Sequence, residues 1–336
     1  LYGGALWQKQ KTRKKRPKKS RLKHQKKKSR KNWKRKIKKT DPRKRSRESA
    51  AFNLQDRHGK KIYMDMVSRI YCESLKLRAY TVVTKETAAE ITSLHKTTPS
   101  ATLALGRSIN AAALIAATLK PESNQSILMK FSGEGPVREV HVQCDAFGNV
   151  RGYIANPAPD ITDDIGTLSF SKAIGAGLLT IIKDLGMGDP YNSVTPLLYG
   201  EVAADLAYHL TTSEQVPSAV ILGLNMDRDG AISSSGGILI QTFPDTGPEA
   251  IEKVESNIKS MPASLGDLLE NGENIHNIVS GLFDNHKTEI LSSGPIKHKC
   301  RCSHDMLLGL MKTVNHEELM EMIETDKGAS VTCTFC

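Results

Sequence analysis

Residues 218–243 have the sequence SAVILGLNMDRDGAISSSGGILIQTF, which predicts a β-hairpin. Two runs rich in aliphatic residues, 218–226 and 231–243, flank the tetrapeptide Asp227-Arg-Asp-Gly230. A short connection that contains Asp and Gly between two such runs is typical of a hairpin turn. Gly236 and Gly237 lie inside the second run, which indicates a bulge or a close approach of the backbone to a neighbour.

Further strands are predicted upstream of this hairpin. In residues 137–144, Val137, Val140 and Val142 are interspersed with polar residues, and Gly133-Glu-Gly135-Pro136 is a turn sequence. Alternating runs separated by Gly-containing turns indicate an antiparallel meander. The strands expected outside the hairpin are 77–84, 126–131, 137–144, 150–155 and 177–184.

Three helices are predicted at 85–95, 99–119 and 199–213. The second is rich in Ala and Leu and indicates a buried helix, whereas the third carries apolar residues on one face only. No run of 18 apolar residues without a charge occurs, so no membrane span is expected. The predicted fold class is α+β, with a mostly antiparallel β-sheet platform and packed helices.

The segment that follows the hairpin changes in character. Residues 249–283 are helical in pattern and mixed in charge, with breaks at Pro262, Gly266, Gly272 and Gly281. We therefore predict several short helices that form a linker, rather than one rigid helix.

Four of the six cysteines form a metal-binding pattern near the C-terminus. Cys300 and Cys302 form C-x-C, and Cys333 and Cys336 form C-x-x-C after a gap of 30 residues. Four thiolates are a tetrahedral ligand set that Zn²⁺ favours, and so small a unit needs a metal to fold. Two functions stay open from the residues alone: a structural zinc unit, or a thiol switch that loses zinc on oxidation.

The other candidate ligands are given different roles. We expect His298, His304 and His316 to lie outside the ligand set, because four thiols already complete it. Cys72 and Cys144 have no partner at short spacing and are expected to be buried apolar thiols. Neither paired carboxylates nor a Ser/His/Asp arrangement stands out, so we do not expect an enzyme. Free thiols in a metal pattern indicate a reducing compartment, hence the cytoplasm.

The N-terminal segment is extremely basic. Residues 1–50 hold 24 Lys and Arg against two acidic residues, whereas the rest of the chain has a net charge of −10. Such a segment is expected to be disordered in isolation. It is either an arm for nucleic acid or an extension that is not native, and the position of the first methionine, Met64, favours the second interpretation. We take Met64 as the expected natural start. The alternative function is therefore a nucleic-acid-binding protein that uses this tail and a structural zinc unit.

The chain resembles the 33 kDa chaperonin family over about residues 64–336. The resemblance rests on an ordered set of motifs: Arg78-Ala-Tyr-Thr-Val82, Gly133-Glu-Gly135-Pro136, Lys183-Asp-Leu-Gly186 with Pro190-Tyr191, Gly200-Glu-Val-Ala203 with Asp205-Leu206, Ser213-Glu-Gln215 with Pro217-Ser218, Gly236-Gly237, Cys300-Arg-Cys302-Ser303 and Cys333-Thr-Phe-Cys336. The basic tail lies outside the resemblance.

The resemblance implies a redox-regulated holdase, a chaperone that needs no ATP and binds unfolding client proteins under oxidative and heat stress. It implies one zinc held by Cys300, Cys302, Cys333 and Cys336 in the reduced, inactive state. Oxidation then forms the disulfides Cys300–Cys302 and Cys333–Cys336, releases zinc, unfolds the linker and gives an active homodimer. The resemblance assigns no client-binding residues.

The domains expected from the residues and the resemblance are a basic disordered tail at 1–63, an α+β chaperone core at 64–245, a helical metastable linker at 246–295 and a four-cysteine redox-switch unit at 296–336. Members of the family continue past the second cysteine pair, whereas this chain ends at Cys336. We therefore expect the zinc unit to lack its final strand.

Overall fold

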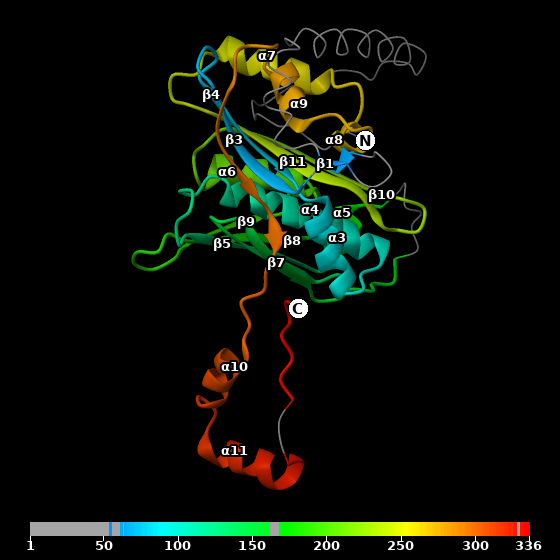
Figure 1. Cartoon of the computed structure of the whole chain (residues 1–336), viewed down its shortest axis with the longest axis vertical. Coiled ribbons are helices and arrows are strands. Elements are labelled where there is room, and N and C mark those ends of the chain that lie inside the picture. The colour runs from blue at the N-terminus through cyan, green and yellow to red at the C-terminus, as the bar shows by residue number, and fades with distance from the viewer. Residues whose placement is uncertain (1–53, 56–60, 63, 162–167, 328–329) are drawn as a thin grey trace.

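The computed structural model describes residues 54–55, 61–62, 64–161, 168–327 and 330–336 (Figure 1). Two β-sheets form two layers, with helices packed between them and three more helices on the outer face of one sheet (Figure 1). The predicted α+β class is confirmed, and the platform consists of two sheets rather than one. The predicted tail lies largely outside the described residues, apart from a short antiparallel pair formed by β1 (Leu54–Gln55) and β2 (Lys61–Ile62).

The first sheet contains the predicted hairpin and is antiparallel throughout. The hairpin register shifts between Asn225 and Met226, so the bulge does not lie at the two glycines. Gly236 is instead a point of close approach, because a Cβ there would lie 2.6 Å from the carbonyl oxygen of Val82 on the neighbouring strand. The strand order is β10 (Ser218–Met226), β11 (Ile232–Thr242), β4 (Leu77–Val83), β3 (Met66–Cys72) and β12 (Glu289–Pro295).

The second sheet contains the predicted meander. Its strands pair antiparallel, except that the edge strand β13 runs parallel to β7. The strand order is β13 (Lys297–His298), β7 (Asn149–Ile154), β6 (Glu139–Asp145), β5 (Ser126–Gly133), β8 (Gly177–Asp184) and β9 (Tyr191–Pro196).

The main hydrophobic core surrounds helix α4 (Pro99–Ala116), which lies between the two sheets. Of its 18 residues 16 are buried, so the predicted buried helix is confirmed. Its buried Asn110 donates hydrogen bonds to the carbonyl oxygen of Gly223 (3.2 Å) and to the hydroxyl of Ser235 (3.0 Å), which satisfies its amide group. The same layer holds α3 (Lys85–Leu94), α5 (Phe170–Ile174) and α6 (Val202–Thr212).

A second hydrophobic core lies on the outer face of the five-stranded sheet. The predicted short helices are present as α7 (Pro248–Lys259), α8 (Leu265–Glu270) and α9 (Ile275–Leu282). They bury Val254, Ile278 and Phe283 against the apolar side chains of β3, β4, β10 and β11. The helices of the expected linker therefore cover an apolar sheet face.

The two isolated cysteines are buried, as the sequence predicts. Cys72 is fully buried and Cys144 is 2% exposed, and both are free thiols. Burial and the nearby Asp145 carboxylate raise the pKa of the Cys144 thiol far above its usual range. Because both thiols are buried, neither is accessible as a nucleophile. In the described part of the chain, no helix combines the length and the apolar character that crossing a membrane requires.

Two buried titratable groups have opposite effects on stability. His209 is fully buried, with its ring nitrogens 2.9 Å from the hydroxyls of Ser193 and Thr195, and burial lowers its pKa to about 4. Asp65 is 8% exposed, and burial raises its pKa to about 6 even though the backbone N–H groups of Glu86 and Thr87 donate to its carboxylate. Acid therefore destabilises the fold through His209, whose unfolded form protonates first, and stabilises it through Asp65, whose folded form protonates first.

We expect these two effects to cancel between about pH 6.5 and about pH 4.5, at about 2 kcal/mol each. In urea unfolding, H209Q should gain about 2 kcal/mol relative to the unaltered protein on this acidification, whereas D65N should lose about the same amount. All three proteins carry the same four clustered cysteines. The contribution of these thiols to the pH dependence of the free energy of unfolding therefore cancels in the comparison. Parallel pH profiles for all three proteins would contradict the assignment.

Candidate metal centre

Strand β13 brings the first cysteine pair to the edge of the six-stranded sheet. The backbone N–H groups of Lys297 and Lys299 donate to the carbonyl oxygens of Gly148 (3.0 Å) and Val150 (2.9 Å). Ile296, just before the strand, is buried in the main core, and its N–H donates to the carbonyl oxygen of Asp65. Cys300 therefore follows a segment that is fixed to both sheets.

The chain then leaves the body of the molecule and returns (Figure 1). The outward excursion consists of α10 (His304–Met311), α11 (His316–Glu321) and the π-helical turn Met322–Asp326. Ser303 and Asn315 cap the two helices by accepting hydrogen bonds from backbone N–H groups. These helices return the chain so that the second cysteine pair meets the first.

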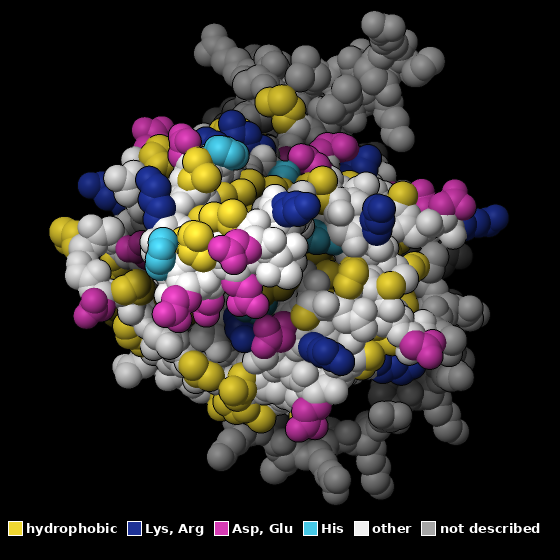
Figure 2. Space-filling model, turned by 90° about the horizontal axis from the view of Figure 1, so that it is seen from below, with side chains coloured by type: hydrophobic (Ala, Val, Ile, Leu, Met, Phe, Trp, Pro, Cys, Tyr) yellow, Lys and Arg dark blue, Asp and Glu magenta, His cyan; other side chains and the backbone are white. Residues whose placement is uncertain are grey.

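The excursion has almost no core of its own. No residue of α10 or α11 is buried, and Met306, Leu308 and Leu310 are 43–55% exposed. The surface seen from the side to which these helices project shows hydrophobic side chains interspersed with charged ones (Figure 2). Burial of apolar surface therefore contributes little to holding this unit together.

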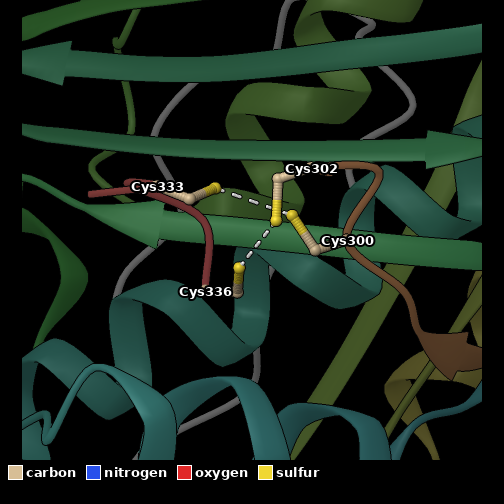
Figure 3. Close-up of side chains that lie close together, drawn as sticks. All are labelled: Cys300, Cys302, Cys333 and Cys336. Carbon is tan, nitrogen blue, oxygen red and sulfur yellow. Dashed lines mark hydrogen bonds between the residues drawn. The ribbon is translucent and has the colours of Figure 1, made fainter. Parts of the chain in front are cut away.

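The four predicted cysteines form one cluster (Figure 3). All four sulfur atoms lie within 4.8 Å of one another, and the Sγ–Sγ distances are 3.7 Å for Cys300–Cys333 and 3.2 Å for Cys302–Cys336. Tetrahedral thiolates at a Zn–S distance of about 2.3 Å would have sulfur atoms about 3.8 Å apart. The size of the cluster is therefore consistent with one zinc ion.

The thiols of the cluster hold protons unequally. Burial would raise the pKa of Cys300, but hydrogen bonds from Cys302, Cys336 and Cys333 outweigh it and lower that pKa to about 6. The hydrogen bond with Cys302 is the main cause of a raised pKa at Cys336. A cluster that carries one easily formed thiolate is suited to a cation that displaces the remaining protons.

The histidines near the cluster do not join the four sulfur atoms. The group of possible ligands contains the four cysteines alone among the described residues. His298 has its Nδ1 2.9 Å from a carboxylate oxygen of Glu90, and His304 and His316 are exposed.

The sequence did not indicate Arg151 as part of the site. This side chain, on β7, donates from Nη1 to the sulfur of Cys300 at 3.9 Å. The contact joins residues 149 positions apart, so it depends on the parallel pairing of β13 with β7. The only signal in the sequence is that Arg151 alternates with the inward-facing Val150 and Gly152.

Comparison with known proteins gives a consistent result. The family model described as Hsp33 protein matches residues 65–336. The 33 kDa chaperonin of Syntrophotalea carbinolica is 37% identical over 273 residues, which cover 81% of this chain and 94% of that protein. The 33 kDa chaperonin of Aquifex aeolicus is 35% identical over 264 residues, covering 77% of this chain and 81% of that protein.

A solved structure supports the same assignment. The crystal structure of the 33 kDa chaperonin from Thermotoga maritima superposes with a TM-score of 0.74 at 30% identity, covering 82% of this chain and 93% of that chain. The matched family, the similar fold and the four-cysteine cluster together show that this chain belongs to the Hsp33 family of redox-regulated chaperones, which are not enzymes.

Proposed function

We propose that the protein is an ATP-independent holdase of the cytoplasm and that oxidation of its four clustered cysteines switches on the binding of unfolded clients. The observation that carries the proposal is the meeting of four thiols from two separate motifs, next to a segment whose hydrogen bonds fix it to the body of the protein. In the reduced state, a zinc ion bound there would keep the thiolates reduced and supply the folding energy that the excursion lacks.

The proposed ligands are Cys300, Cys302, Cys333 and Cys336, and the proposed disulfides are Cys300–Cys302 and Cys333–Cys336. Each disulfide forms when two thiols give two electrons and two protons to one hydrogen peroxide, which becomes two water molecules. A sulfur in a disulfide is no longer a thiolate ligand, so the metal is lost with the second bond.

The pairing within each motif is supported by chain length. The shortest sulfur distances in the cluster join cysteines of different motifs, but those contacts depend on the folded excursion. Once the excursion opens, closing a loop of one or two residues costs far less entropy than closing one of 30. Peptide mapping of the fully oxidised protein tests this pairing directly.

One continuous segment connects the cluster to the edges of both sheets. Residues 289–299 run along the edge of the first sheet as β12 and continue to the edge of the second sheet as β13. Most side chains of β12 are exposed, so backbone pairing with β3 is its main attachment. Loss of the cluster would free the C-terminal end of this strand, and its other end leads directly to α9.

Each proposed domain has a distinct role when this strand detaches. The core is residues 64–245, the metastable linker is 246–295 and the switch unit is 296–336. Helices α7–α9 of the linker cover an apolar face of the five-stranded sheet. Their detachment would expose a contiguous apolar surface, the kind of surface that binds unfolded protein. The oxidised state is proposed to be a homodimer.

The test compares reduced, oxidised and re-reduced protein in the aggregation of a chemically denatured client. We expect suppression by the oxidised form only, with a doubled mass in light scattering, and loss of suppression after re-reduction with zinc. Equal suppression by all three forms would contradict the redox switch. A monomer that suppresses aggregation would contradict only the homodimer.

A further inference from the structure

The residue inside the first cysteine motif contacts the body of the protein. Arg301, between Cys300 and Cys302, donates from Nη2 to a carboxylate oxygen of Asp145 at 2.8 Å. Asp145 is 5% exposed and is held by its own turn, because its carboxylate also accepts from the N–H groups of Phe147 and Asn149. A buried, fixed carboxylate is a preformed partner for a guanidinium group.

The residue inside the second motif contacts the same sheet. Phe335, between Cys333 and Cys336, lies under the guanidinium carbon of Arg151, which is 4.3 Å from the ring centroid. The ring of Tyr153 meets it edge to face at 5.2 Å. These are the geometries of a cation–π contact and a favourable aromatic pair.

The side chains that contact Phe335 are held by partners on the same sheet. On the outer face of β6 and β7, Gln143 lies opposite Arg151, and His141 lies opposite Tyr153. The Oε1 atom of Gln143 accepts two hydrogen bonds from Arg151, at 2.6 and 2.8 Å. The imidazole of His141 stacks on Tyr153 with ring centroids 4.6 Å apart. We call these four residues the β6–β7 platform.

We propose that Arg301 and Phe335 dock the metal centre on Asp145 and the β6–β7 platform, and that this docking sets how readily the switch releases zinc. The proposal rests on the proposed function and adds how the release of zinc is regulated. Each docking residue lies between two cysteines, so each contact restrains one of the two motif loops. Both loops must be held together to present four sulfurs to one cation, and docking keeps them in place.

The docking contacts also link zinc loss to the body of the protein. Arg151 contacts Phe335 through its guanidinium face and Cys300 through Nη1, so one side chain bridges the two motifs. Displacement of either motif therefore removes one of the two contacts by which this side chain joins them. The docking residues are positioning residues, because they act on the thiols by fixing the loops that carry them.

The test measures zinc release from the reduced protein to a colorimetric chelator, with no oxidant present. We expect R301Q and F335A each to release zinc roughly tenfold faster than the unaltered protein. Two matched controls keep the cysteines and alter a neighbour: K299Q removes a charge next to Cys300, and T334A alters the residue before Phe335. Both control side chains are exposed, and both variants should stay within about twofold.

Further variants separate docking from damage to the fold. F335Y keeps the ring and should restore slow release. The double variant R151A/F335A should release zinc at a rate below the product of the two single effects, because both changes remove the same Arg151–Phe335 contact. Release rates equal to those of the controls, or fully multiplicative effects in the double variant, would overturn the proposal.

The outcome is also distinguishable from failure of the proposed function. After complete oxidation, all variants should suppress client aggregation as the unaltered protein does, because docking is then already lost. If the oxidised unaltered protein binds no client while R301Q and F335A still release zinc faster, the docking stands and the holdase assignment fails. If client binding follows oxidation and release is unchanged in these variants, the docking fails alone.

Discussion

Replacement of Cys336 by serine is expected to abolish stable zinc binding. Structural zinc sites contribute on the order of 10–16 kcal/mol from four ligands, so one thiolate accounts for roughly 3 kcal/mol, or at least about 100-fold in affinity. The two helices between the cysteine motifs bury no residue, so core packing does not hold this part of the excursion closed. We therefore expect the C336S variant to lose zinc on dialysis and to be cleaved rapidly by protease within residues 303–332.

The control for this experiment is Cys144→Ala. Cys144 is buried in the main core, far from the metal-binding pattern in sequence, and has no sulfur partner. This variant tests whether loss of any thiol, or of some core packing, is enough to release zinc. It should retain one zinc per chain and resist protease within the excursion. Full zinc retention by C336S would contradict the assignment of Cys336 as a ligand.

Replacement of Phe283 by alanine is expected to produce client binding without oxidation. Phe283 directly follows α9 in the proposed linker, and its side chain is fully buried in the second core. Removal of a buried phenylalanine side chain costs about 3–5 kcal/mol, and here the cost acts on the contact between α7–α9 and the sheet. The reduced F283A variant should therefore suppress client aggregation while it retains zinc.

A matched substitution in the other core separates this effect from general destabilisation. Phe131 is also fully buried, and its ring meets Phe170 edge to face at 5.2 Å in the main core. F131A should lower the free energy of unfolding by a similar amount, about 3–5 kcal/mol. Below its unfolding temperature, however, the reduced F131A variant should not suppress client aggregation. Equal client binding by both reduced variants would contradict a specific role for the linker. A reduced F283A variant that does not suppress client aggregation would contradict it as well.

Local sequence patterns predicted the elements whose periodicity is strong. The hairpin of β10 and β11 and the buried helix α4 were both predicted, because each has a dense run of apolar residues with a clear boundary. Strand β9 was missed, since its sequence YNSVTP has few apolar residues and its buried positions are Ser193 and Thr195. Its pairing depends on β8 and α6 rather than on its own composition.

The metal centre was likewise predicted in part from local sequence and in part not. Spacing alone brought the four cysteines into one predicted cluster, because two short thiol motifs in a unit too small for a core leave few alternatives. The surroundings of the cluster could not be predicted in this way. Arg151 and Asp145 reach it only through the pairing of β13 with β7, which joins segments about 150 residues apart. Likewise, the helices α7–α9 were expected, but the second core beneath them is a tertiary property.

The most direct test follows zinc, free thiols and client binding in one sample after addition of peroxide at raised temperature. The account predicts that one zinc and four thiols per chain are lost together, with suppression of client aggregation appearing only afterwards. Retention of zinc through oxidation, or suppression that precedes the loss of zinc, would contradict the redox switch.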